Sequence, residues 1–120
     1  MFADDDVNVS TLVSKLLDPH YEVVGIATGG KDALHRILEL APDFAVLDIS
    51  MPEIDGFAVA RQLQKAHCPT KLVFLTLIED VDYVSVAKTI GHGYVLKKRV
   101  VVDLPAALMA AGDGNFFSSL

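Results

Sequence analysis

Four of the predicted strands end on side chains that can take part in chemistry. The apolar run Phe44–Leu47 is about as long as a buried strand, and it ends on the carboxylate of Asp48. The other side chains at strand ends are Asp4 and Asp5, Thr76, and Lys97. Because the carboxyl ends of parallel strands meet at one edge of an open α/β sheet, where ligands bind, we expect these side chains to converge.

The chemistry of such a cluster follows from its charges. Two carboxylates in one cleft repel each other and stay ionised together only when a cation joins them. An all-oxygen ligand set suits Mg²⁺, which keeps several waters and takes few protein carboxylates. Lys97 supplies a positive charge for an anion, and Thr76 supplies a hydroxyl donor. A carboxylate nucleophile, Mg²⁺, a hydroxyl and a lysine together predict a site for phosphoryl transfer to aspartate.

The elements that must position these residues alternate along the chain. Strand and helix patterns follow one another five times, which predicts a parallel sheet with helices on both faces. The predicted strands are residues 1–3, 21–27, 44–48, 71–76 and 93–97. The predicted helices are the segment from Val9 to Leu17 and residues 31–40, 56–67, 80–90 and 101–111. The last helix is expected to start near Asp103, because Pro105 fits best in a first turn, and residues 112–120 are expected to form a tail.

Composition narrows the class of protein. The 120 residues fit one domain, residues 1–120, and the 52% hydrophobic and 22% charged content is typical of a globular fold. A formal net charge of −6 argues against DNA binding by this segment itself. The single cysteine, Cys68, cannot form an internal disulfide. No signal-peptide pattern and no apolar run of roughly 20 residues is present, so we expect a cytoplasmic domain with no membrane contact.

The set of motifs resembles the receiver domain of bacterial two-component response regulators. The matching pieces are Ala3-Asp4-Asp5, Leu47-Asp48-Ile49-Ser50-Met51-Pro52 with Asp55-Gly56, Leu75-Thr76, and Gly93-Tyr94-Val95-Leu96-Lys97. They stand in the family's order, with 43 residues from Asp5 to Asp48, 28 more to Thr76 and 21 more to Lys97. Each piece alone is weak, but the set covers essentially the whole chain and is specific. The resemblance implies a flavodoxin-like, doubly wound, five-stranded parallel sheet of order 2-1-3-4-5 with five helices.

The resemblance also implies a role for each site residue. Asp48 would accept the phosphoryl group from a sensor histidine kinase. Mg²⁺ would be held by Asp4, Asp5, Asp48 and the backbone carbonyl of Ser50. Thr76 and Lys97 would contact the phosphoryl group, and Tyr94 would move into the space that Thr76 leaves. The surface of the fourth helix, fifth strand and fifth helix would then change for a partner. Such a domain is a switch that acts on its own modification and is not a turnover enzyme.

Further details resemble the NarL/FixJ type, in which a receiver precedes a helix-turn-helix output domain. These details are the sequence motifs around Asp48 and Tyr94 and the tail Gly114-Asn115-Phe116-Phe117-Ser118. The resemblance implies control of transcription through DNA binding by a separate output domain beyond residue 120, and a homodimer on phosphorylation. Three features depart from the usual pattern: the first strand is short, Lys98 follows Lys97, and His92 stands where alanine is common.

Two alternatives of other classes remain open. One is a pseudo-receiver that binds proteins without phosphorylation; the full set of Asp5, Asp48, Thr76 and Lys97 argues against it. The other is a haloacid-dehalogenase-type phosphohydrolase, which also uses a strand-end aspartate with Mg²⁺. That class has a second aspartate two residues on, and here the position is Ser50. Taken without its neighbours, Tyr94 is more typical of a core residue than of a switch.

Overall fold

One parallel sheet with helices on both faces forms the fold. The computed structural model describes residues 1–4, 6–17 and 21–120, without the side chains of residues 7–10. Within these residues, six strands lie in the order β2-β1-β3-β4-β5-β6, and every adjacent pair is parallel. The strands are β1 (Phe2–Ala3), β2 (Ile26–Ala27), β3 (Phe44–Asp48), β4 (Lys71–Thr76), β5 (Gly93–Leu96) and β6 (Phe117–Ser118). The helices are α1 (Val7–Leu17), α2 (Gly30–Leu40), α3 (Gly56–Lys65), α4 (Val81–Ile90), the short η1 (Lys97–Arg99) and α5 (Val100–Gly112).

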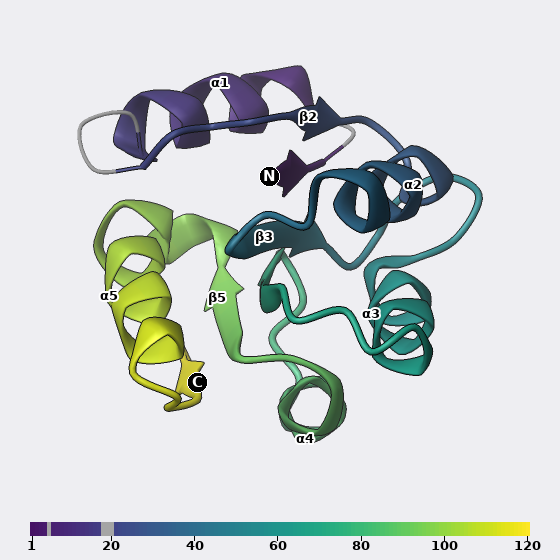
Figure 1. The fold of residues 1–120 in the computed structure, drawn as a ribbon. Helices are drawn as coiled ribbons and strands as arrows, with labels where there is room; N and C mark the ends of the chain where they lie inside the picture. The colour runs from purple at the N-terminus through teal and green to yellow at the C-terminus, as the bar shows by residue number, and fades with distance from the viewer. Residues whose placement is uncertain (5, 18–20) are drawn as a thin grey trace.

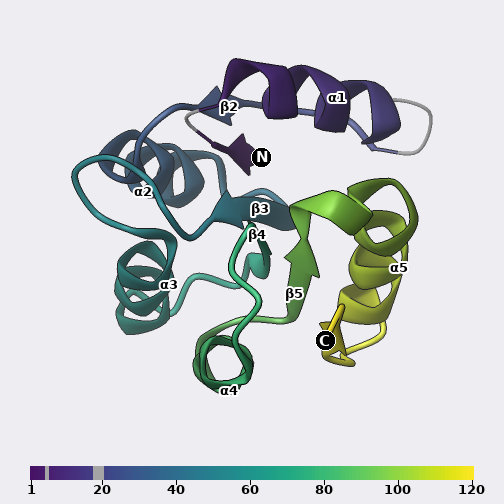
Figure 2. The ribbon, with the colours of Figure 1, turned by 180° about the vertical axis from the view of Figure 1, so that it is seen from behind.

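Two layers of helices bury the two faces of the sheet (Figures 1 and 2). Helices α2, α3 and α4 cover one face, over a cluster that includes Ile37, Leu63 and Phe74, while α1 and α5 cover the other, over Val73 and Leu104. Successive residues of a strand point to opposite faces, so both faces of the central strands are apolar. The burial of Leu72–Leu75 accounts for the continuous apolar run that predicts β4. Among the helices in the described part of the chain, none has the length and apolar character needed to cross a membrane.

The predicted order 2-1-3-4-5 is confirmed, and the sheet has one more strand than predicted. The tail pairs with the open edge of β5 as β6, in the register Gly93↔Phe117 and Tyr94↔Ser118. The prediction of an irregular tail was therefore wrong for Phe117–Ser118. A strand of two residues in a segment rich in Gly and Ser carries no periodic signal of its own, because its formation depends on the edge beside it.

Strand β2 is shorter than the predicted 21–27. Its neighbour β1 offers only two partners, Phe2↔Ile26 and Ala3↔Ala27. Residues 21–26 still alternate between half-buried and exposed, as the residues of a strand do. Val23 and Val24 line a cavity of about 420 Å³. The β-forming pattern is present there, and the pairing partner sets how much of it becomes a strand.

The last helix also starts earlier than predicted. Strand β5 ends at Leu96, η1 follows, and α5 begins at Val100, so Pro105 lies inside the helix. Proline removes the amide that would bond to the carbonyl of Val101, four residues earlier. Val101 is 59% exposed, so this end of the helix faces solvent and tolerates the loss.

Candidate functional site

Three charged side chains meet at the carboxyl edge of the sheet. Strand β1 pairs with β3 in the register Ala3↔Leu47, which places Asp4 next to Asp48 on neighbouring strands. Lys97 follows β5, and its Nζ lies 2.9 Å from Asp4 Oδ2 and 2.9 Å from Asp48 Oδ2. Both carboxylates are buried, with Asp4 0% and Asp48 4% exposed. The sequence placed these three residues at strand ends, and the structure brings them into contact.

Burial dominates the electrostatics of this cluster. The pKa of Asp48 is raised, first by burial and then by the nearby charge of Asp4, although the Lys97 ammonium and the Ser50 amide act in the opposite direction. The Ser50 amide donates to Asp48 Oδ1 over 3.1 Å. Burial alone would lower the pKa of Lys97, but its contacts with the two carboxylates outweigh burial and raise it. Two carboxylates share one ammonium here, so this buried cluster holds more negative than positive charge.

Thr76 and Tyr94 are linked through the backbone of Ile78. Thr76 is buried, and its Oγ1 accepts the Ile78 amide over 3.1 Å. Tyr94 is fully buried, and its hydroxyl donates to the Ile78 carbonyl over 2.5 Å. Because β3 and β4 pair in the register Asp48↔Leu75, Thr76 lies one residue beyond Asp48 on the adjacent strand. Sequence reasoning missed Ile78, since both of its contacts use backbone atoms that no residue type signals.

The ring of Tyr94 already fills the interior next to this segment. Burial raises the pKa of its hydroxyl to about 12, and the charges of Asp80 and Tyr83 act in the same direction. The hydroxyl therefore stays protonated and can donate to a carbonyl at any ordinary pH. The structure thus describes Tyr94 in the inward position.

The loop after β3 is shaped by Gly56 and Asp55. A Cβ at Gly56 would lie 2.3 Å from the Asp48 carbonyl oxygen, so only glycine lets α3 begin this close to the strand. The Gly56 amide donates to the Ile49 carbonyl over 2.8 Å, which closes the loop. Asp55 Oδ1 accepts the Ala58 amide over 2.8 Å and caps α3. This packing fixes the backbone that carries Asp48.

The acidic residues fit a hard cation. Asp4 Oδ2 is fully buried, and the Lys97 ammonium pairs with it over 2.9 Å. Because the same ammonium also pairs with Asp48, the two carboxylates share one positive charge, and carboxylate and carbonyl oxygens are the ligands that Mg²⁺ prefers. The hydrogen bond from the Ser50 amide to Asp48 Oδ1 holds the Ser50 backbone beside this carboxylate. Among the described residues, no group of three or more His, Cys, Asp or Glu could hold a metal; Asp5, the third predicted carboxylate, lies outside them.

The chain is similar to several known proteins. The family model described as "Response regulator receiver domain" matches residues 1–109. The uncharacterized transcriptional regulatory protein YvfU of Bacillus subtilis is 38% identical over 116 residues, which are 94% of this chain and 58% of that protein. A protein-glutamate methylesterase/protein-glutamine glutaminase of a Nocardioides species is 34% identical over 78% of this chain and 26% of its own length.

Solved structures give the same result. A DNA-binding response regulator of the LuxR family from Staphylococcus aureus superposes with a TM-score of 0.83, at 27% identity, over 90% of this chain and 92% of that chain. The chain spans little more than half of YvfU and a quarter of the methylesterase. The matched segments are similar in sequence to this chain, although the two relatives differ in their named activities. The chain belongs to the response regulator receiver domain family.

Proposed function

We propose that residues 1–120 form a cytoplasmic receiver domain that accepts a phosphoryl group on Asp48 from a sensor histidine kinase. One observation carries this proposal: the Asp48 carboxylate stands at a strand end within 2.9 Å of the Lys97 ammonium, with Asp4 on the neighbouring strand. A carboxylate held by a lysine in a buried site is both a nucleophile and a place where a phosphoryl dianion is compensated.

The transfer would use Asp48, Lys97 and Thr76. An Asp48 oxygen attacks the phosphorus of a phosphohistidine, an O–P bond forms, and the N–P bond breaks. The electron pair of that bond returns to the imidazole of the kinase. Lys97 offsets the charge of the phosphoryl group, as it now offsets that of Asp48. The Thr76 hydroxyl accepts the Ile78 amide, so its own proton is free for donation to a phosphoryl oxygen.

Mg²⁺ fits the same edge of the sheet. Asp4, Asp5, Asp48 and the backbone carbonyl of Ser50 would hold it. When bound, it supplies positive charge that neutralises the transferring phosphoryl group. Two buried carboxylates that share the single Lys97 ammonium are the observation that supports this ligand set.

The switch follows from the link through Ile78. A phosphoryl group that holds Thr76 also holds the segment from Thr76 to Ile78, and the Ile78 carbonyl holds the Tyr94 hydroxyl. The surface of α4, β5 and α5 would therefore change together with the site. By similarity to regulators such as YvfU, the output would be transcription, through DNA binding by a separate domain and a homodimer that forms on phosphorylation. On this account the domain turns over no substrate other than its own phosphoryl group.

Intact mass spectrometry tests the proposal. Incubation with acetyl phosphate and Mg²⁺ is expected to add one phosphoryl group to the wild type, and none without Mg²⁺ or in Asp48→Asn. A folded wild type that never gains the adduct would favour the pseudo-receiver, which binds partners without phosphorylation. Continuous release of phosphate from many substrates would favour a phosphohydrolase, although Ser50 stands where that class needs its acid.

A further inference from the structure

The C-terminal segment lies along the edge strand of the sheet, next to the predicted switch residue. The Ser119 amide donates to the Tyr94 carbonyl over 2.9 Å, and the Phe117 amide donates to the His92 carbonyl over 3.4 Å. These bonds continue the parallel pairing of β6 with β5. The tail thus covers an edge whose backbone groups would otherwise be open to another strand.

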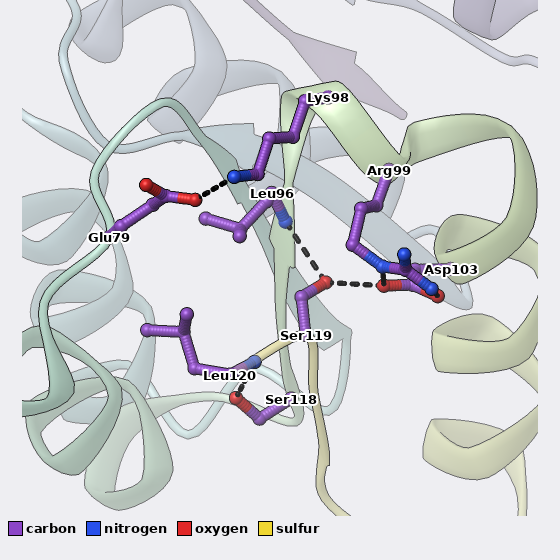
Figure 3. A network of polar contacts seen from close by, with 8 residues as sticks. All are labelled: Glu79, Leu96, Lys98, Arg99, Asp103, Ser118, Ser119 and Leu120. Carbon is purple, nitrogen blue, oxygen red and sulfur yellow. Dashed lines mark hydrogen bonds and ion pairs between the residues drawn. The ribbon is translucent and has the colours of Figure 1, made fainter.

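A single side chain clamps the tail in place. The Ser119 hydroxyl accepts the Leu96 amide over 3.1 Å and donates to Asp103 Oδ2 over 2.7 Å (Figure 3). The same carboxylate oxygen accepts Arg99 Nε over 2.7 Å. Ser119 therefore joins β5, the tail and α5, whereas the hydroxyl of its neighbour Ser118 accepts the nearby Leu120 amide.

The carboxylate in this clamp is suited to its role. Asp103 is 5% exposed, and the hydrogen bonds from Arg99 and then Ser119 lower its pKa. It is therefore ionised at neutral pH, and a hydroxyl that donates to a carboxylate makes a stronger bond than one that donates to a neutral acceptor. Sequence reasoning missed this clamp, because it joins residues that are 16 positions apart.

The clamp and the phosphorylation site share Tyr94. Its carbonyl accepts the tail, and its hydroxyl donates to the Ile78 carbonyl. The Ile78 amide in turn donates to Thr76, the predicted phosphoryl contact. A continuous series of hydrogen bonds thus runs from Thr76 to Ser119 through a residue whose ring is fully buried.

We propose that the segment Phe117–Leu120 is a latch on β5 that is coupled to the phosphorylation site through Tyr94. Docking of the latch holds Tyr94 inward, and a phosphoryl group on Asp48 holds Thr76 and Ile78 in the arrangement that Tyr94 needs. The inference rests on the proposed function, since it names how phosphorylation of Asp48 would be coupled to the segment Phe117–Leu120. Because coupling between two sites is reciprocal, loosening the latch must weaken binding at Asp48 by the same factor by which phosphorylation tightens the latch.

Beryllofluoride with Mg²⁺, a stable stand-in for the phosphoryl group, provides the test. Fluorine NMR would measure its affinity for the full chain as wild type, Ser119→Ala and Ser118→Ala. Ser119→Ala removes both clamp bonds and should weaken binding about fivefold or more, the lower end of ordinary allosteric coupling. Ser118→Ala makes the same chemical change one residue away and should bind as the wild type does.

Amide hydrogen exchange gives a second readout. Beryllofluoride should slow exchange at the Leu96 and Ser119 amides in the wild type, because both amides bond within the latch. Equal affinity in all three proteins, with no change at these amides, would overturn the latch and leave the proposed function standing. No binding to the folded wild type would overturn the proposed function itself. Asp103→Asn, which keeps the shape of the acceptor but removes its charge, should give an intermediate loss.

Discussion

Replacement of Lys97 by methionine tests the electrostatics of the site. Without the ammonium, Asp4 and Asp48 face each other with no compensating charge. Both carboxylates lie 2.9 Å from Nζ, so their contacting oxygens are at most about 5.8 Å apart, and their repulsion at an effective dielectric constant of about 20 is about 3 kcal/mol or more. Protonation limits the cost: carrying a carboxyl from its ordinary pKa of 3.8 to pH 7 takes about 4 kcal/mol, at about 1.4 kcal/mol per unit.

Lys97→Met should therefore lower the free energy of unfolding by about 3–4 kcal/mol at neutral pH without divalent ions. Urea denaturation followed by circular dichroism would measure it. The loss should shrink toward pH 4, where the carboxylates take up protons, and in Lys97→Met/Asp48→Asn, which has no repelling pair. Lys98→Met is the matched control, because the Lys98 side chain is 65% exposed and pairs with Glu79 at the surface, so the urea midpoint of this variant should not move. A loss that is below about 1 kcal/mol, or that does not change with pH, would show that Lys97 does not compensate the charges of Asp4 and Asp48.

Two further predictions concern residues around the site. His92 Nδ1 accepts the Leu72 amide over 3.0 Å, and burial, with a neighbouring lysine charge, lowers the His92 pKa, so the folded state binds the proton less readily than the unfolded one. The contribution of neutral His92 to stability is therefore complete above the ordinary pKa of 6.5 and is lost as the pH falls below that value. Thermal unfolding should show this pH dependence in the wild type. It should be absent in His92→Asn, whose side-chain amide oxygen can replace Nδ1 as the acceptor. Gly56→Ala should lower the free energy of unfolding, measured in urea, by about 2 kcal/mol or more and should slow formation of the phosphoryl adduct, because the new Cβ meets the Asp48 backbone. Gly112→Ala should do neither, because the nearest contact of its Cβ is 3.6 Å away. Equal effects of the two substitutions would contradict this explanation.

The sequence predicts most reliably what depends on local pattern. The run Phe44–Asp48 and the run Lys71–Thr76 form strands with the predicted bounds, because both strands are buried on two faces and read as continuous apolar segments. The convergence of Asp4, Asp48 and Lys97 follows from the parallel direction of the strands, because the carboxyl ends of parallel strands meet at one edge of the sheet.

What the sequence does not predict depends on partners elsewhere in the chain. The length of β2 is set by the two residues of β1, and β6 exists because β5 has an open edge. The Ser119 clamp and the Ile78 link are tertiary contacts, and Ile78 contributes only backbone atoms. No spacing rule along one chain reports such contacts.

The most direct measurement locates the phosphoryl group on the chain. Borohydride reduces an aspartyl phosphate to homoserine, and tandem mass spectrometry of the digested protein identifies the modified position. After incubation with acetyl phosphate and Mg²⁺, homoserine is expected at position 48 and at no other aspartate. Homoserine at Asp4 or Asp55 in place of Asp48, or none in a folded protein that carries the mass adduct, would contradict the assignment of the phosphoacceptor.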